Sequence, residues 1–478
     1  MFAGAPEVPI VANAGHYPPL GLLYIAAYLE KHAPEHHLTV CDAPTDGLDV
    51  RAIIGQITAL RPDVVGIYFA TPFLYDALAA ADAVKSRFPH VKIIAGGPHT
   101  ALYSRETIGL PSVDCVIVGE AEKTFHAVIS CLDSHDLDRI EYLPNVLTKQ
   151  SPADKNVVRE RISDLDDLPF PARHLLDHTK YTSIVARHNP ITTIISSRGC
   201  PYQCRFCSNL ESGQKNRVRS QANVVDELQE VQKDFGISDF LFFDELFSAY
   251  KSRVLAICDE IIRRGLKIRW HCRCRADQID EEMLVRMKKA GCRLMQFGIE
   301  TGTKRLQEYT NKKLDLDRTR FIIKAAARNR IYTYADFILG LPTESDEETE
   351  ATIEFAKSLS LDYAHFHIYS PTPHSAFFEM GLKAGNFQDF WKEYVAHPDR
   401  PIAAYTWDAN DREKYRMFYA QAFRSFYLRP AYMLRHSLRI DSWGQAQWQC
   451  RAAIKVLAGF FNRGSRPPQR TPAGAGSQ

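Results

Sequence analysis

The chain has 478 residues, of which 45% are hydrophobic and 24% are charged, as is typical of a soluble globular protein with a sizeable core. Its 59 Lys and Arg residues and 57 Asp and Glu residues give a net charge of +2, too small an excess for a protein whose main partner is nucleic acid. The sequence contains no apolar run of about 18 to 20 residues and no secretory signal pattern at its start. We therefore expect a cytoplasmic protein of several domains, with no nucleic-acid partner and no transmembrane segment.

Residues 1–135 alternate helices with short apolar strands, which predicts a doubly wound parallel sheet of the Rossmann-like type. Its strands are continuous apolar runs, as expected when both faces of a sheet are covered. The predicted helices are 20–31, 50–60 and 75–88, and the predicted strands are 38–41, 63–69, 91–97 and 115–120. Residues 1–17 offer only a poor opening strand, so either that strand is weak or the sequence begins late. Ligands of such sheets bind beyond the carboxyl ends of the strands.

Residues 136–188 form a connector that includes the proline-containing run DLDDLPFPAR at 164–173, which is expected to be extended. Residues 189–390 then contain six βα units, which predicts a partial (β/α)6 barrel of the TIM type with its chemistry at the strand carboxyl ends. The predicted strands are 191–196, 239–243, 267–272, 294–298, 334–339 and 363–369, and the predicted helices are 222–235, 250–264, 281–289, 314–329 and 346–359.

Residues 391–462 form a predicted helical region, with helices at 411–439 and 443–461, and residues 463–478 form a disordered tail rich in Gly, Pro, Ser and Arg. The first helix is rich in Tyr, Phe and Arg. We expect it to pack on the barrel with its arginines reaching solvent. A lid over a large substrate, or peripheral contact with a membrane, is the alternative.

Three of the eleven cysteines, Cys200, Cys204 and Cys207, lie within eight residues after the first barrel strand. Three thiolates on one loop are suited to hold an iron-sulfur cubane by three corners, which leaves one iron open for a ligand. A structural zinc site that uses Cys272 and Cys274 is disfavoured, because a CxC on a strand points both sulfurs the same way and lies one βα unit away. A redox dithiol leaves Cys200 unexplained. The eight other cysteines are expected to be small buried hydrophobes.

The CxxxCxxC motif, with Phe206 before its third cysteine, follows a domain that contains PPLGLLYIAAYLE, GGPH, GEAE and DLDDLPFPAR. Together these features resemble the cobalamin-binding radical S-adenosylmethionine (SAM) superfamily, a group with methyltransferases and the anaerobic Mg-protoporphyrin ester cyclase. The resemblance covers about residues 15–440. It implies a [4Fe-4S] cluster on Cys200, Cys204 and Cys207, SAM bound at the open iron, and cobalamin bound by the first domain.

Carried over position by position, the resemblance also implies cofactor contacts. Those to SAM are Phe206, Asp244, Glu245, Arg275, Glu300 and Gly340, and those to cobalamin are Leu20, Thr71, Gly97, His99, Gly119 and Glu120. The chain has no DxHxxG run, so the cobalt is expected to lack a histidine ligand, and another role is favoured for His99. GEAE in place of GEGE, and PTPHSA at 371–376 in place of P-x-PGT, leave the substrate contacts open. No further catalytic residue is assigned.

The resemblance implies reductive cleavage of SAM to a 5'-deoxyadenosyl radical and, foremost, methylation of an unactivated carbon of a small-molecule or secondary-metabolite substrate. A radical cyclase or rearrangement enzyme acting on a tetrapyrrole or lipid is one alternative. A non-catalytic iron-sulfur and corrinoid carrier or sensor is another, disfavoured because a carrier needs no open iron beside strand-end acids. A reducing partner such as a flavodoxin or ferredoxin is also implied. The sequence does not identify the substrate.

Overall fold

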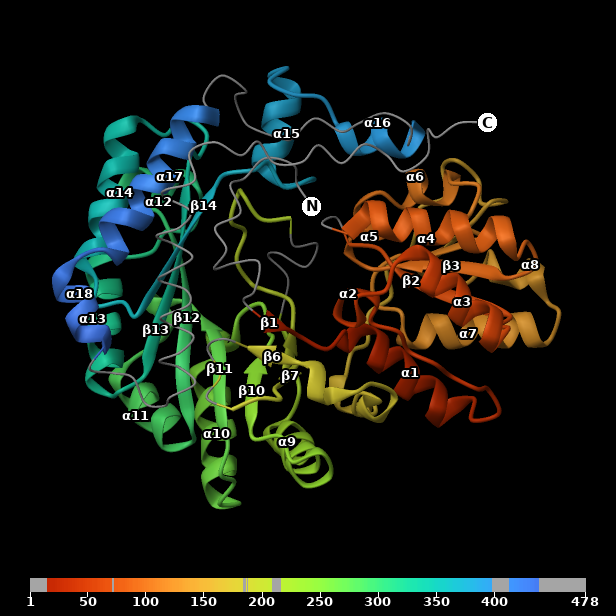
Figure 1. Ribbon diagram of the computed structural model, residues 1–478, viewed down its shortest axis with the longest axis horizontal. Coiled ribbons are helices and arrows are strands. Elements are labelled where there is room, and N and C mark those ends of the chain that lie inside the picture. The colour runs from red at the N-terminus through yellow and green to blue at the C-terminus, as the bar shows by residue number, and fades with distance from the viewer. Residues whose placement is uncertain are drawn as a thin grey trace.

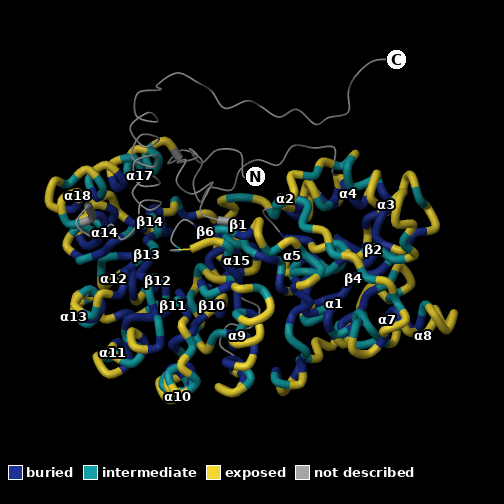
Figure 2. Tube along the Cα trace, turned by 60° about the horizontal axis from the view of Figure 1, so that its bottom comes forward, coloured by how far each residue is buried: buried dark blue, intermediate teal, exposed yellow. Residues whose placement is uncertain are grey.

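The computed structural model describes residues 15–70, 73–183, 186, 188–208, 216–397 and 412–437. Two α/β units lie side by side, an N-terminal unit in red and orange and a barrel unit in green and blue (Figure 1). Buried residues follow the strands of both units, and exposed residues lie mainly along the outer helices (Figure 2). Among the described residues, no helix is long and apolar enough to cross a membrane.

The N-terminal unit is built on a four-stranded sheet of order β2-β3-β4-β5. Its strands are β2 (Val64–Tyr68), β3 (Lys92–Gly96), β4 (Cys115–Ile117) and β5 (Val146–Thr148), and its longer helices are α1 (Leu20–His32), α3 (Val50–Leu60), α4 (Leu74–Arg87) and α7 (Glu122–Asp133). Strands β2, β3 and β4 are parallel. Helices α1 and α7 pack together on one side of the sheet, and α4 lies on the other (Figure 1). This arrangement confirms the predicted doubly wound sheet.

Two local predictions in this unit are wrong. Residues 38–41 form no strand, because Leu38 and Val40 pack their side chains against α1 instead of pairing beside β2. Conversely, β5 lies within the predicted connector and pairs antiparallel with β4. A three-residue strand is too short to show a period in the sequence, and pairing with β4 decides its structure.

The barrel unit is a six-stranded, all-parallel sheet of order β14-β13-β12-β11-β10-β7, which confirms the predicted partial barrel. Its strands are β7 (Thr192–Ile194), β10 (Asp239–Phe242), β11 (Arg269–Cys274), β12 (Cys292–Glu300), β13 (Tyr332–Leu339) and β14 (Tyr363–Ile368). The helices over its convex face are α9 (Gln221–Phe235), α10 (Lys251–Arg263), α11 (Glu281–Lys289), α13 (Leu316–Arg328) and α14 (Asp346–Ser358) (Figure 1). Every second side chain of the central strands, such as Phe297 and Phe337, is fully buried in the core under these helices.

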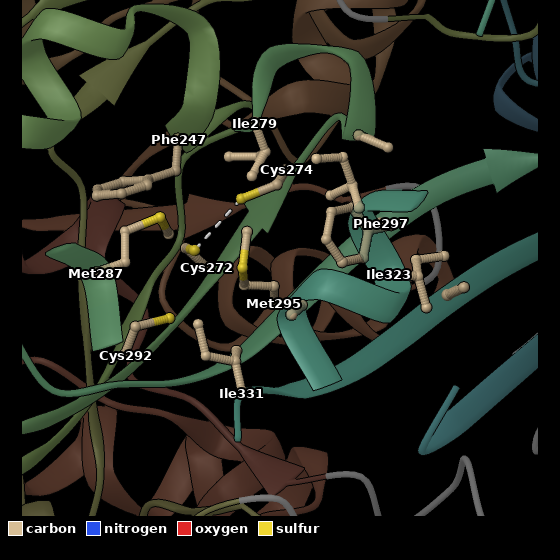
Figure 3. Close-up of a cluster of buried hydrophobic side chains, with 14 of the residues drawn as sticks. Phe247, Cys272, Cys274, Ile279, Met287, Cys292, Met295, Phe297, Ile323 and Ile331 are labelled. Atoms are coloured by element: carbon tan, nitrogen blue, oxygen red, sulfur yellow. Dashed lines mark hydrogen bonds between the residues drawn. The ribbon is translucent and has the colours of Figure 1, made fainter. Parts of the chain in front are cut away.

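Three cysteines meet in this core: Cys272 and Cys274 from β11, and Cys292 from β12 (Figure 3). The sulfurs of Cys272 and Cys274 are 3.4 Å apart, as expected for alternate residues of one strand that face the same side. Met287, Met295 and apolar side chains surround them (Figure 3). Burial raises the pKa of Cys272 well above its usual value, so the thiol stays neutral. These three are buried, as predicted for small hydrophobic residues, whereas Cys41, which was predicted to be buried as well, is exposed because residues 38–41 form no strand.

Helices of the last described part connect the two units and cover the barrel edge. Helices α15 (Ala376–Lys383) and α16 (Phe390–Ala396) lie at the top between the units (Figure 1), and Phe378 and Trp391 join the core of the N-terminal unit. Helix α17 (Arg412–Tyr427) packs on β14 and is followed by α18 (Pro430–Ser437). The predicted single helix is therefore two, because Pro430 lacks the N–H that a continuous helix needs.

The Tyr427 hydroxyl donates to the carbonyl of Ala364 at 2.7 Å and accepts from its N–H at 3.1 Å. Phe423 and Phe426 are buried in the barrel core. These contacts confirm that the first aromatic helix packs on the barrel. The predicted helix at 443–461 and the tail lie outside the described residues.

We predict that Cys274→Ser lowers stability without removing any bound metal. A serine hydroxyl in this apolar core has no partner, which costs about 1–3 kcal/mol, so the midpoint of thermal unfolding falls by several degrees. Calorimetry and metal analysis measure the two effects, with Cys41→Ser at an exposed cysteine as the control. Loss of metal from the Cys274 variant would contradict the assignment.

Candidate functional site

The three clustered cysteines lie between two short strands that pair antiparallel, β8 (Ser197–Arg198) and β9 (Arg217–Val218). We call residues 199–208, which contain them, the cysteine loop. Cys200 and Cys204 are half-buried and Cys207 is exposed, and none of the three is in a disulfide. The cysteines of the barrel core, in contrast, are buried among apolar side chains. Three accessible cysteines on one loop fit the donor set of an iron-sulfur cluster.

Hydrogen bonds from distant segments fix this loop. The N–H of Arg205 donates to the carbonyl of Thr310 at 2.9 Å, and the carbonyl of Arg205 accepts from the N–H of Phe377 at 3.0 Å. The side-chain amide of Asn311 donates to the carbonyl of Gln203 at 2.8 Å. The cysteine loop is therefore attached to the segments that follow β12 and β14, which holds its sulfurs in place before any cofactor binds.

Positive charges face the cysteine loop from the barrel. Burial raises the pKa of the Cys204 thiol, but the charges of Lys312 and Arg275 act in the opposite direction and favour the thiolate. The guanidinium of Arg275 lies 3.8 Å from the centre of the Tyr202 ring, on the same loop. Two cations beside three thiols suit a site that has to hold thiolates or another anionic group.

Asp244, which follows β10, is buried and supports the start of the loop. Its carboxylate accepts hydrogen bonds from the N–H and hydroxyl of Ser196 at 2.7 and 2.6 Å, and from those of Ser197 at 3.1 and 2.9 Å. Arg253 lies 3.5 Å from the same carboxylate. The adjacent Glu245 accepts from the N–H of Gly199 at 2.6 Å. Both acids thus hold the chain just before Cys200, and their contacts with SAM stay predictions.

Two of the other predicted SAM residues also lie at strand ends. Glu300 ends β12 with a φ of 71° and pairs with Lys312 at 3.1 Å. Arg275 follows β11 and donates to both oxygens of Asp277, at 3.1 and 2.8 Å. Lys312 was missed by the sequence reasoning, because it lies in a loop that only the fold brings beside the cysteines.

The turn after β13 contains the predicted residue Gly340 and a glutamate that sequence reasoning missed. Gly340 has a φ of +83°, and its N–H and that of Leu341 donate to the carboxylate of Glu344 at 2.6 and 2.7 Å. Burial raises the pKa of Glu344 to about 7. The sequence GLPTE directly after a strand was the available signal. Phe206, from the cysteine loop, packs nearby against Leu341.

The predicted cobalamin residues lie at the strand ends of the N-terminal unit. Gly97 has a φ of +112°, and a Cβ there would lie 2.6 Å from the carbonyl of Phe69 and 2.9 Å from the Tyr68 ring, so only glycine fits. Gly119 also has a positive φ, of +98°. Tyr68 is 48% exposed beside Gly97 and offers a flat apolar surface that sequence reasoning missed. Leu20 is buried in α1, and Thr71 lies outside the described residues.

His99, at the start of α5 (Pro98–Leu102), is fully buried. Its ring lies 5.1 Å from Tyr103 and 5.7 Å from Trp391 of α16, between ring centres. Burial lowers its pKa to about 4, so the ring is neutral. The histidine therefore takes part in the packing of α5 against α16.

Glu120 connects the N-terminal unit to the cysteine loop. Its carboxylate accepts from Arg198 at 3.0 Å and from Arg217 at 2.9 and 2.8 Å, which are the two arginines of the paired strands β8 and β9. Glu122 accepts from Arg198 at 2.5 Å. All four side chains are at most 17% exposed. We call this set, Glu120, Glu122, Arg198 and Arg217, the interdomain ion pairs.

Comparison with known proteins gives two family matches, the radical SAM superfamily over residues 194–356 and the B12 binding domain over residues 7–129. An uncharacterized methyltransferase of Pyrococcus horikoshii is 32% identical over 434 residues, which are 89% of this chain and 91% of that protein. The anaerobic magnesium-protoporphyrin IX monomethyl ester cyclase of Rubrivivax gelatinosus is 29% identical over 427 residues, 88% of this chain and 75% of that protein.

Two solved structures share the fold. The cobalamin-dependent SAM radical enzyme OxsB, with aqua-cobalamin and SAM bound, superimposes with a TM-score of 0.71 at 15% identity, over 95% of this chain and 70% of that one. The radical SAM methyltransferase TsrM of Kitasatospora setae, with cobalamin and a [4Fe-4S] cluster bound, gives a TM-score of 0.65 at 17% identity, over 78% and 76%.

We predict that Glu120→Gln weakens the connection between the units. Burial acts to raise the pKa of Glu120, but hydrogen bonds from Arg217 and the charge of Arg198 outweigh it and lower the pKa. A lowered pKa means that the carboxylate stabilises the fold above the usual glutamate pKa of about 4.3, and that this contribution is lost as the pH falls through the folded-state value. The variant removes the charge at every pH.

Chemical unfolding of the cluster-free protein, from pH 7 down to well below the usual glutamate pKa of about 4.3, measures the effect. We expect the free energy of unfolding of the variant to be about 1–3 kcal/mol lower at neutral pH. It should also change less with pH than that of the unmodified chain. Glu35→Gln, at an exposed glutamate, is the matched control. Identical pH profiles for the Glu120 variant and the unmodified chain would refute this role.

Proposed function

Because the chain belongs to the family of radical SAM enzymes with a cobalamin-binding domain, we propose that it transfers a methyl group to an unactivated carbon of a small molecule. The observation that carries this proposal is the set of interdomain ion pairs, which joins Glu120 of the cobalamin-binding unit to the two paired strands on either side of the cysteine loop. A methyl donor in one unit and a radical generated in the other have to reach the same carbon, so their relative position has to be fixed. The methyltransferase of Pyrococcus horikoshii, which aligns with this chain over 91% of its own length, supports the same activity.

Cys200, Cys204 and Cys207 would hold the [4Fe-4S] cluster, as three accessible cysteines outside any disulfide allow. When bound, the cluster supplies the electron that cleaves SAM to methionine and a 5'-deoxyadenosyl radical, and cobalamin supplies the methyl group. Arg275 and Lys312 would balance the negative charge of the thiolates and of the SAM carboxylate. Glu300, which pairs with Lys312 in this structure, would accept a hydrogen bond from the ammonium or a ribose hydroxyl of SAM.

Asp244 and Glu245 act, in this proposal, by positioning the loop. Their oxygens are engaged by Ser196, Ser197 and Gly199, so they fix the backbone that leads into Cys200. Gly340 and Phe206 would line the SAM site from the turn after β13 and from the loop itself.

In the N-terminal unit, Gly97 and Gly119 would allow the close approach of the corrin, and the exposed face of Tyr68 would pack on it. His99 is engaged in packing with Tyr103 and Trp391, which supports a cobalt without a histidine ligand. Glu120 supports the bound cofactor indirectly, through the interdomain ion pairs. The small-molecule substrate would enter between the units, and a flavodoxin or ferredoxin of the cytoplasm would supply the electron.

A radical cyclisation is the second candidate function, supported by the cyclase relative that matches 88% of this chain. Both functions need the cluster and SAM. They differ in the fate of the substrate radical, since only methyl transfer consumes a second SAM to restore the methyl group and releases S-adenosylhomocysteine.

We predict that the chain, reconstituted without oxygen with iron, sulfide and hydroxocobalamin, binds about four irons and one corrinoid. With dithionite and SAM it should form 5'-deoxyadenosine, and with substrate also S-adenosylhomocysteine and a methylated product. Liquid chromatography with mass spectrometry measures these products. Cys204→Ala should lose the iron and all SAM cleavage, while Cys274→Ala, in the barrel core, should keep both.

Bound cofactors without any 5'-deoxyadenosine would indicate a carrier or sensor and refute an enzymatic function. Formation of 5'-deoxyadenosine and a cyclised product, without S-adenosylhomocysteine, would replace methyl transfer by the second candidate.

A further inference from the structure

Three side chains with metal-ligating groups meet on the concave face of the barrel sheet: Asp336 from β13, and His365 and His367 from β14. Asp336 and His365 are directly paired in the register of the two strands. Their neighbours Ala335 and Phe337 are buried under the outer helices, so the alternating pattern places Asp336 on the opposite, inner face. None of the three residues takes part in the cysteine loop or its supports.

Both histidines approach the same carboxylate oxygen at long hydrogen-bond distance, and a shared ion fits this spacing equally well. Nδ1 of His365 lies 3.5 Å, and Nε2 of His367 lies 3.4 Å, from the same oxygen, Oδ1 of Asp336. A good N–H···O hydrogen bond has a separation of about 2.9–3.0 Å, which is shorter than both. Ligand atoms about 2.0–2.1 Å from a tetrahedral zinc ion lie about 3.4 Å from one another, close to both values.

The other carboxylate oxygen is already engaged. Oδ2 of Asp336 accepts a hydrogen bond from the side-chain amide of Gln296 on β12, at 2.7 Å. This contact turns Oδ1 toward the two histidines, as outer partners of metal ligands generally do. The residue paired with Asp336 on β12 is Gly298, and the carboxylate of Glu300 and the amine of Lys312 occupy the space beside its Cα.

The cluster is open on one side. The side chains of Asp336 and His365 are 19% and 14% exposed, whereas His367 is 48% exposed. Three protein ligands with one accessible side match a zinc site that keeps its fourth position for water or a substrate oxygen.

A second group of three possible metal-ligating side chains has a different geometry. Glu35, His36 and Asp133 lie on the surface of the N-terminal unit, and Nε2 of His36 lies 2.9 Å from Asp133, an ordinary hydrogen bond. That group is explained by its own pairing and makes a suitable control.

We infer that Asp336, His365 and His367 bind one Zn²⁺ ion inside the barrel, with an open position for an anionic or carbonyl oxygen of the substrate. Binding of zinc rests on these residues alone and not on the proposed function. It can be measured without substrate and without turnover. A chain that binds no zinc can therefore still be a methyltransferase, and a chain without methyltransferase activity can still bind zinc.

The experiment uses the protein loaded with cluster and cobalamin, so that the three cysteines are occupied. After equilibration with Zn²⁺ and gel filtration, mass spectrometry of the elements should find about one zinc per chain. His367→Gln and Asp336→Asn should lower zinc affinity at least tenfold, and Gln296→Ala should lower it about 10- to 100-fold by loosening Asp336. His36→Gln should keep the zinc.

Iron and corrinoid content, unchanged in every variant, show that each chain is folded. X-ray absorption at the zinc edge should find imidazole nitrogen and oxygen neighbours and no sulfur. A chain that takes up no stoichiometric zinc, variants that bind zinc as well as the unmodified chain, or sulfur at the zinc would each overturn the inference.

Discussion

The carboxylate of Glu120 and the guanidinium groups of Arg198 and Arg217 form the contact on which the arrangement of the two units depends. A charged group with so little exposure destabilises the fold unless it is paired with an opposite charge. This contact therefore stabilises the protein only when all of its charged groups have their partners. Since both arginines flank the cysteine loop, the shape of that loop and the docking of the N-terminal unit are decided together. A shift of one unit would leave charges of the other without partners.

The barrel supports the same loop from its opposite side. Asp244 holds Ser196 and Ser197, just before the first cysteine, while the carbonyl of Thr310 and the N–H of Phe377 hold Arg205 in the middle. A loop fixed from two units and from several strand ends does not need its cofactor to acquire a defined shape. For a site that has to aim a reactive radical at one carbon, such order before binding limits the misdirected chemistry that a mobile loop would allow.

The sequence predicted the parts of this molecule that follow from local pattern. Six consecutive units of strand and helix identified the barrel, and the spacing of Cys200, Cys204 and Cys207 identified their loop. The short strand β5 has no readable period, and residues 38–41 resemble a strand although Leu38 and Val40 pack on a helix. Partners distant in the chain were also hidden: nothing near Asp244 indicates that two serines would occupy its oxygens, and nothing near Lys312 indicates that it would face Cys204.

The group of Asp336, His365 and His367 was hidden for a related reason. Histidines two apart in YAHFHI share one face of a strand, but whether that face is a packed core or an open interior depends on how many strands the barrel has. The six-stranded sheet has two open edges, and its inner-face side chains Asp336, His365 and His367 are partly exposed in the part of the chain that the structure describes, so polar side chains are tolerated there. Gly298, on the strand beside Asp336, has Glu300 and Lys312 next to its backbone. The two histidines and the residues proposed to hold SAM therefore lie on the same inner surface. A substrate oxygen bound by the proposed zinc ion would therefore lie on the same inner surface as Glu300 and Lys312.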